Sequence, residues 1–397
     1  MDVYYFSEMA YHPAWEKSPG NLRNEMPSAL YDPVHGHALY NRFLDEYLLA
    51  DEVGLNLMIN EHHSTATCGS TICSIPLAIL ARQTRKAQLL ALGMMVAHRN
   101  DPVRIAEEFA MIDVISGGRL EIGMVKGGSA ELHPANLNPM HLNERFWEAH
   151  DLIVKALTTH DGPFSWEGRH FNYRSVNVWP RTYQTPHPPI WMPVASAEST
   201  GVVADKGYVA ACLNTGFSET RKLFDRYRAH AAASKKRTDE SGMAYLAFVG
   251  IGETKEEGYR RAGALLDYIK SQSQRRPQYA NPVGLTPPPV MAQIIASGKA
   301  KPSPIYARDG RLIDRSQMTV DSMIDAGTMF AGTPDQVYRQ IEEFYRHVGG
   351  FGRLLIMSEG TWMEHKDTAS GIKLFGREVA PRLKELKMPE SALAAAS

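Results

Sequence analysis

The sequence lacks three features that would each define a class of protein. Its three cysteines, Cys68, Cys73 and Cys212, are too few for a disulfide framework and have no zinc-binding spacing. Its 43 Lys and Arg residues balance 44 Asp and Glu residues, so no strong field attracts nucleic acid or an anionic membrane. No apolar run approaches a membrane span, and "MDVYYFSEMAYHP" lacks the pattern of a signal peptide. We therefore expect a globular cytoplasmic protein with buried, reduced cysteines.

Short apolar runs are abundant, and they alternate with amphipathic stretches. Continuous apolar runs, rather than alternating ones, are typical of strands buried on both faces of a parallel sheet. Eight such runs interleaved with helices predict a (β/α)8 TIM barrel, an α/β fold, rather than an open doubly wound sheet. The runs are 3–9, 55–60, 89–97, 119–125, 189–196, 209–215, 243–251 and 353–358.

Two of the intervening segments have clear helix boundaries. One begins with an Asp-Pro pair at 101–102 and ends at a Gly pair at 117–118. The other begins with a Thr-Pro-Asp-Gln capping box at 333–336 and ends at a Gly pair at 349–350. Apolar residues recur along one face of each helix at spacings of three and four. They are Ile105, Phe109, Ile112 and Ile115 in the first helix and Val337, Ile341, Phe344 and Val348 in the second.

Two insertions interrupt the alternation, after the fourth and after the seventh predicted strand. The first, 127–188, contains a helix near 143–158 and an aromatic segment at 162–180 that predicts a β-excursion. The second, about 270–330, is rich in Pro, Gln, Ser and Lys and is either a lid over a site or a solvated surface loop. We find no linker, so 1–397 is expected to be one domain with a helical tail at about 362–397.

In such a barrel, catalytic residues lie where strands end and the following loops begin. The second predicted strand leads into Asn60-Glu61-His62-His63, and the fourth leads into Lys126 and two glycines. The fifth leads into Ala195, followed by hydroxyl residues and a helix start. Lys126, the exposed N–H groups and these hydroxyls would together form a phosphate site. The alternative is that Ser199 only caps its helix. The hydroxyl residues are Ser196, Ser199 and Thr200.

The histidine pair could belong either to a metal site or to a proton-transfer site. Adjacent residues of a strand point to opposite faces, so His62 and His63 would not both ligate one ion while extended. The exits of the fifth and sixth strands carry Ser196 and Asn214, and neither adds a histidine or carboxylate. We therefore expect no metal. A lone histidine is usually structural, but two beside Glu61 at a strand exit favour a functional role.

Four ordered motifs give the chain a resemblance to a known family. They are "NEHH" at 60–63, "DPVRIAEEFAMIDVISGGRLEIGMVKG" at 101–127, "PHPPIWMPVASAEST" at 186–200 and "AGTPDQV" at 331–337. In this order the chain resembles the bacterial luciferase-like flavin-dependent monooxygenases over nearly its whole length. The resemblance implies a TIM barrel that binds reduced FMN at its C-terminal mouth. It also implies a homodimer and a separate NAD(P)H:flavin reductase that supplies FMNH2.

The resemblance also assigns residues. His62 matches the family's catalytic histidine, with Glu61 and His63 in supporting roles. Lys126, next to Gly127, matches the basic phosphate ligand. Residues of the third strand would lie beneath the flavin ring, often with a non-proline cis peptide there. The third-strand residues are Met94, Met95 and Val96. The hydroxyl side of the phosphate site is Ser196 with Ser199 or Thr200, and Ala195 is a further cofactor-binding residue.

The implied reaction begins when reduced FMN and O2 form a C4a-(hydro)peroxyflavin, which oxygenates a small organic substrate. His62 is suited to move a proton on that adduct or on the substrate, and a lid at 270–330 would keep the adduct dry. The substrate stays open among aldehydes, ketones, sulfonates, amines and aromatic compounds. Tyr5, Phe6, Tyr11 and Trp15 are candidates for its pocket, and surface packing is an equal alternative for Tyr11 and Trp15. One alternative is an F420-dependent oxidoreductase on the same barrel. The other is a flavin-binding barrel without catalysis, and the presence of His62, Glu61 and Lys126 together argues against this second alternative.

Overall fold

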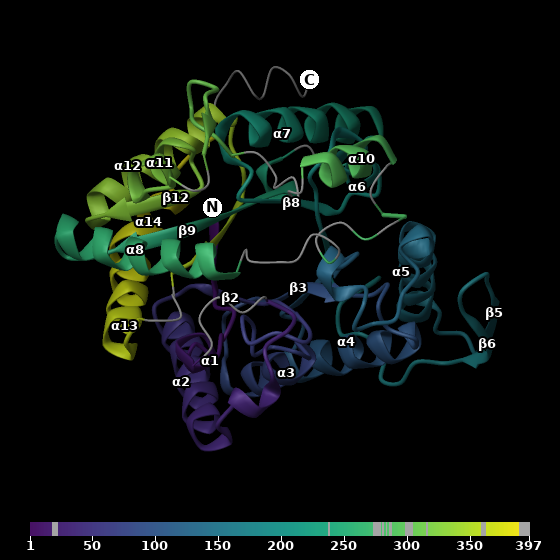
Figure 1. Cartoon of the computed structure of the whole chain (residues 1–397). Helices are drawn as coiled ribbons and strands as arrows, with labels where there is room; N and C mark the ends of the chain where they lie inside the picture. The colour runs from purple at the N-terminus through teal and green to yellow at the C-terminus, as the bar shows by residue number, and fades with distance from the viewer. Residues whose placement is uncertain are drawn as a thin grey trace.

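Eight parallel strands close into a barrel in the computed structural model of this protein (Figure 1). Each strand pairs with the next, and β8 pairs with β9 to close the ring. The predicted TIM barrel and its eight strands are confirmed. The strands are β1 (Asp2–Phe6), β2 (Asn56–Ile59), β3 (Leu89–Met95), β4 (Leu120–Val125), β7 (Ile190–Pro193), β8 (Val209–Leu213), β9 (Met243–Ile251) and β13 (Arg353–Met357). The structure describes residues 1–17, 23–236, 239–272, 279, 282, 284–285, 288–297, 305–314, 317–358 and 363–388.

One further parallel strand, β12 (Met329–Gly332), was not predicted. It pairs with the last four residues of β9, Phe248–Ile251, whereas β13 pairs with Ala244–Phe248 of the same strand. At nine residues β9 is long enough to serve both partners in succession. The short run "MFAG" alone is too brief to distinguish a strand from a loop.

Helices surround the barrel and cover its outer face (Figure 1). None in the described part of the chain is long and apolar enough to cross a membrane. The longer helices are α2 (Pro33–Glu52), α3 (Ser74–Gln83), α4 (Pro102–Ser116), α5 (Leu142–Thr158), α6 (Ala197–Asp205), α7 (Gly216–Ala233), α8 (Lys255–Gln272), α10 (Pro288–Ser297), α12 (Pro334–His347) and α13 (His365–Leu374). The shorter ones are α1 (Pro13–Lys17), α11 (Val320–Asp325) and α14 (Ala380–Lys384).

Both predicted helix boundaries are confirmed in α4 and α12. The Asp101 side chain accepts a hydrogen bond from the backbone N–H of Arg104, and Gly117 ends α4 in the left-handed region at φ 70°. Thr333 and Gln336 form the capping box of α12. The predicted buried face holds except at Ile115, which is 47% exposed near the end of α4.

The insertions lie where the sequence predicts them. After β4 the chain forms α5 and an antiparallel hairpin of β5 (Phe164–Glu167) and β6 (Asn172–Val176), which lies at the periphery beyond α5 (Figure 1). After β9 the described residues include α8, α10 and a small hairpin of β10 (Ile305–Tyr306) and β11 (Leu312–Ile313). Much of the predicted lid at 270–330 lies outside the described residues, so its role stays a prediction.

Candidate active site

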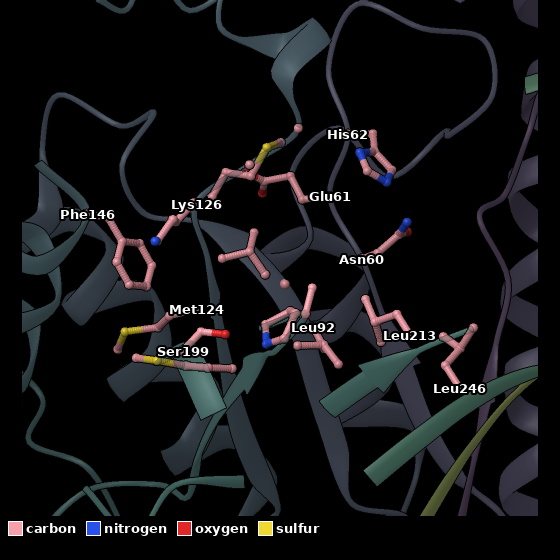
Figure 2. Close-up of a pocket in the computed structure, with 18 of the residues that line it drawn as sticks. Asn60, Glu61, His62, Leu92, Met124, Lys126, Phe146, Ser199, Leu213 and Leu246 are labelled. Atoms are coloured by element: carbon pink, nitrogen blue, oxygen red, sulfur yellow. The ribbon is translucent and has the colours of Figure 1, made fainter. Parts of the chain in front are cut away.

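A cavity of 820 Å³ opens at the C-terminal ends of the barrel strands. Its walls come from the ends of all eight barrel strands and the loops that follow them, which is where TIM barrels place their chemistry. Figure 2 shows Lys126 and Phe146 on one side of the cavity and Leu213 and Leu246 on the other. The volume lies in the upper part of the range for cofactor and ligand pockets.

The cavity brings together eight of the twelve predicted site residues. The eight are Glu61, His62, Met95, Lys126, Gly127, Ala195, Ser196 and Ser199. The four that do not line it are His63, Met94, Val96 and Thr200. Of the predicted aromatic lining, Phe6 lines the cavity, whereas Tyr5, Tyr11 and Trp15 are buried elsewhere.

The third strand differs from the prediction in register. The non-proline cis peptide joins Leu92 to Gly93, not the neighbouring Met94 or Met95, and both Leu92 and Gly93 line the cavity. The pairing of β3 with β4 shifts between Leu92 and Met94. Met95 consequently reaches the cavity, while Met94 packs into the core and its sulfur accepts a hydrogen bond from Arg99 at 3.6 Å.

Glu61 fixes the loops around the site. Its buried carboxylate accepts hydrogen bonds from Arg99 at 3.0 Å and from the backbone N–H of Cys73 at 3.1 Å, and it lies 3.2 Å from Nε2 of His63. Burial alone would raise the pKa of Glu61, but the hydrogen bond with His63 and the charge of Arg99 hold that pKa below its usual value. Glu61 is therefore ionised and holds the surrounding loops in place. His63 contacts Glu61 and does not line the cavity.

His62 is held by a carboxylate that the sequence did not reveal. Its Nδ1 lies 2.9 Å from Oε1 of Glu131, which also accepts from the backbone N–H of His63 at 3.0 Å. The other oxygen of Glu131 accepts from the backbone N–H of Gly128 at 3.0 Å. Burial alone would raise the pKa of Glu131, but the hydrogen bond and charge of His62 lower it to about 2. This ionised acceptor fixes the Nδ1 proton of His62, so Nε2 is left for the cavity.

A second unpredicted carboxylate lies on the other side of the His62 ring. Oε1 of Glu8 is 4.0 Å from Nε2 of His62. Its Oε2 accepts a hydrogen bond from the hydroxyl of Tyr268 on α8, which also donates to the carbonyl of Thr67 at 2.8 Å. Glu8 follows β1 by two residues and Glu131 follows the Gly pair after β4, so both are acids just past a strand exit. The sequence signal for Glu8 and Glu131 was therefore an acidic residue shortly after a predicted strand.

The opposite end of the cavity carries the predicted phosphate-binding groups. Nζ of Lys126 donates to Oδ1 of Asn143 at 2.6 Å and lies 5.7 Å from the ring centroid of Phe146. Burial lowers the pKa of Lys126, while the charge of Glu198 opposes that shift. Both Lys126 and Glu198 line the cavity, so a cation and a carboxylate face this end of it.

Three hydroxyl groups surround the N-terminus of α6. Ser196 and Ser199 form a capping box, and their Oγ atoms lie 3.0 Å apart at the cavity wall. The buried hydroxyl of Thr200 instead donates to the carbonyl of Ser196 at 2.8 Å. The two serines therefore both cap the helix and face the cavity, whereas Thr200 supports the turn.

The sequence comparison identifies the family. Residues 27–350 match the family of luciferase-like monooxygenases, and the chain therefore belongs to it. Over 367 residues it is 24% identical to the FMNH2-dependent dimethylsulfone monooxygenase of Pseudomonas putida, covering 90% of this chain and 91% of that protein. It is 25% identical over 192 residues to the oxygenase component of the flavin-dependent trigonelline monooxygenase of Acinetobacter baylyi, covering 48% of this chain and 53% of that protein.

Solved structures share the fold. The oxygenating constituent of 3,6-diketocamphane monooxygenase from Pseudomonas putida, in complex with FMN, has a TM-score of 0.72 and 17% identity over 98% of this chain and 99% of that chain. An F420-dependent secondary alcohol dehydrogenase has a TM-score of 0.64 and 14% identity over 88% of this chain and 95% of that chain. The fold is thus common to proteins that use either cofactor.

Proposed function

We propose that this protein is a flavin-dependent monooxygenase that uses reduced FMN and O2 to oxygenate a small organic substrate. The observation that carries the proposal is a single cavity with a cationic, hydroxyl-lined end and an apolar middle. The His62–Glu131 pair stands at its rim. Named relatives with FMNH2-dependent or flavin-dependent monooxygenase activity support it.

The residues present fit FMN. Lys126, Ser196 and Ser199 combine a cation, two hydroxyls and a helix N-terminus, and such groups bind a phosphate. Between this end and His62, Leu92, Gly93 and other apolar lining residues offer a surface suited to a flat aromatic ring. Reduced FMN, when bound, would supply the electrons that activate O2.

The chain's own residues would orient the reactants and manage one proton. Glu131 holds the proton on Nδ1 of His62, so Nε2 can accept or return a proton at the cavity. The buried apolar walls, among them Met124, Leu246 and Phe248, exclude water from the reacting centre. His62 is therefore the proposed catalytic residue, and Glu131 is its positioning residue.

We further propose two protein partners. One relative is named as an oxygenase component, which supports a separate reductase as the source of FMNH2. A homodimer is supported by apolar side chains that neighbouring α3 and α4 expose on their outer faces. They are Ile75 and Ile79 on α3, and Met111, Val114 and Ile115 on α4, with exposed fractions of 37–57%.

Activity assays with the two cofactors test the proposal directly. Purified protein is mixed anaerobically with reduced FMN or reduced F420 and then exposed to O2 with a panel of small substrates. We expect product that contains one oxygen atom from O2 with reduced FMN only. Hydride transfer from reduced F420 without O2 consumption would instead support the second candidate, to which the shared fold of the F420-dependent neighbour points.

A further inference from the structure

The cavity has two chemically different ends that face each other across the barrel. In the ring of strands, β1 lies opposite β7, with three strands between them on either side. Ser196 follows β7, and Glu8 follows β1. If FMN is held as proposed, with its phosphate near Ser196 and Lys126, the end near Glu8 is left for the substrate.

The Glu8 end contains a carboxylate oxygen without a hydrogen-bond donor. Glu8 is only 8% exposed and lines the cavity. Tyr268 donates to Oε2, but within the described part of the chain no hydrogen-bond donor reaches Oε1, which lies 4.0 Å from Nε2 of His62. Oε1 is not among the fully buried side-chain atoms that lack a partner, so it is open to the cavity. A ligand that fills the cavity would remove this oxygen from water, which is costly unless the ligand supplies a cation or a hydrogen-bond donor. The site therefore calls for a positively charged or hydrogen-bond-donating ligand.

Two carboxylates line the Glu8 end of the cavity. Facing His62 are the carboxylates of Glu8 and Glu131, and the charge of buried Arg23 helps to lower the pKa of Glu131. Among the described lining residues, the one Lys or Arg is Lys126, and it belongs to the phosphate end. An anionic substrate group beside Glu8 would be repelled.

The walls below Glu8 also suit a cation. Phe6 on β1 and Phe248 on β9 present aromatic rings, and Met58 on β2 and Met357 on β13 present thioethers. These side chains come from the adjacent strands β9, β13, β1 and β2. Aromatic faces attract ammonium groups most strongly when the pair is shielded from water.

We infer that the substrate is a compound with a positively charged nitrogen, which Glu8 binds beside His62. The inference rests on the proposed function, because it assigns the phosphate end to FMN. It selects amines from the substrate classes open to this scaffold and excludes sulfonates and carboxylates whose charged group would point to Glu8.

Three probes that share one phenyl ring test it: benzylamine, benzyl alcohol and benzoate. Their dissociation constants are measured anaerobically by calorimetry on wild-type protein saturated with reduced FMN. We expect benzylamine to bind about tenfold more tightly than benzyl alcohol, the ratio that about 1.4 kcal/mol of charge recognition gives, and benzoate to bind least. Equal affinity for benzylamine and benzyl alcohol, or tighter binding of benzoate, would overturn the inference.

Two variants locate the effect. Glu8→Gln keeps an acceptor for Tyr268 but removes the charge, so it should abolish the preference for benzylamine. Glu198→Gln removes a carboxylate at the other end of the cavity and should retain the preference. If Glu8→Gln still prefers benzylamine, Glu8 is not the residue that binds the charged nitrogen. If Glu8→Gln does not fold, the order of the three dissociation constants on wild type tests the inference by itself. Failure of reduced FMN to bind would refute the proposed function, whereas binding of reduced FMN without a benzylamine preference refutes the inference alone.

Discussion

His62 is the residue on which the proposed chemistry depends. Its Nε2 is the ring atom left for the cavity once Glu131 binds Nδ1. His62→Ala should lower turnover by about 10²- to 10⁴-fold, the usual contribution of a positioned acid or base. The FMN dissociation constant should not change, because His62 lies away from the phosphate end. Turnover measured with saturating reduced FMN checks this, and an unchanged rate would remove His62 from the mechanism.

Glu131 makes the stability of the fold depend on pH. Its folded-state pKa of about 2 lies below the ordinary value of 4.5, so the stabilisation is present above pH 4.5 and is lost as the pH falls toward 2. A shift of this size corresponds to about 3 kcal/mol for this buried group. Urea unfolding at neutral pH and at about pH 3 should show a smaller acid-induced loss in Glu131→Gln than in wild type. Parallel losses in the two proteins would refute this linkage.

At the residue scale, the sequence predicts those site residues that directly follow an apolar run. His62, Lys126 and Ser196 were found because the strand ends of a barrel share one face. Glu131 is 69 positions from His62, and Glu8 meets it from another strand, so only the closed barrel shows these pairs. Met94 and Met95 could not be separated because the register shift within β3 has no sequence signature.

At the scale of elements, Asp101 joins α4 to the hairpin after β4. Its Oδ1 accepts from the backbone N–H of Arg104 at 3.1 Å and from the hydroxyl of Tyr173 on β6 at 2.9 Å. Asp101→Ala should therefore reduce the free energy of unfolding by about 1–2 kcal/mol, the range for loss of an N-cap. Tyr173→Phe removes the second bond alone and should cost less. Equal stability of Asp101→Ala and wild type in urea would contradict the capping role.

Elements with strong local signals were predictable, and elements defined by pairing were not. Both capping motifs and both Gly stops lie in the sequence itself, which is why α4 and α12 match their predicted bounds. The strand β12 forms because β9 extends beyond its pairing with β13 and leaves its last residues free to pair. This pairing depends on segments that are far apart in the sequence, so the sequence of β12 alone does not reveal it. Ile115 is exposed because the buried face of α4 continues in its last turn through Asp113 and Ser116 instead.

At the scale of the whole molecule, the exposed apolar faces of α3 and α4 predict a dimer. Met111→Lys places a charge at their centre and should shift the mass from light scattering toward the 44.2 kDa of one chain. Leu312→Lys is the control, since Leu312 is 60% exposed on β11, whose hairpin partner β10 contacts α7. A monomeric wild type, or a dimer unaffected by Met111→Lys, would refute this interface.

The central claim is that the cavity binds reduced FMN with its phosphate at Lys126. It is tested most directly by anaerobic titration of wild type and Lys126→Ala with reduced FMN and with reduced riboflavin, which lacks the phosphate. We predict that wild type binds reduced FMN, and that Lys126→Ala weakens this binding about tenfold or more, as expected for a lost charged hydrogen bond. Riboflavin binding should be the same in both proteins. Equal FMN affinity in wild type and Lys126→Ala would contradict the claim.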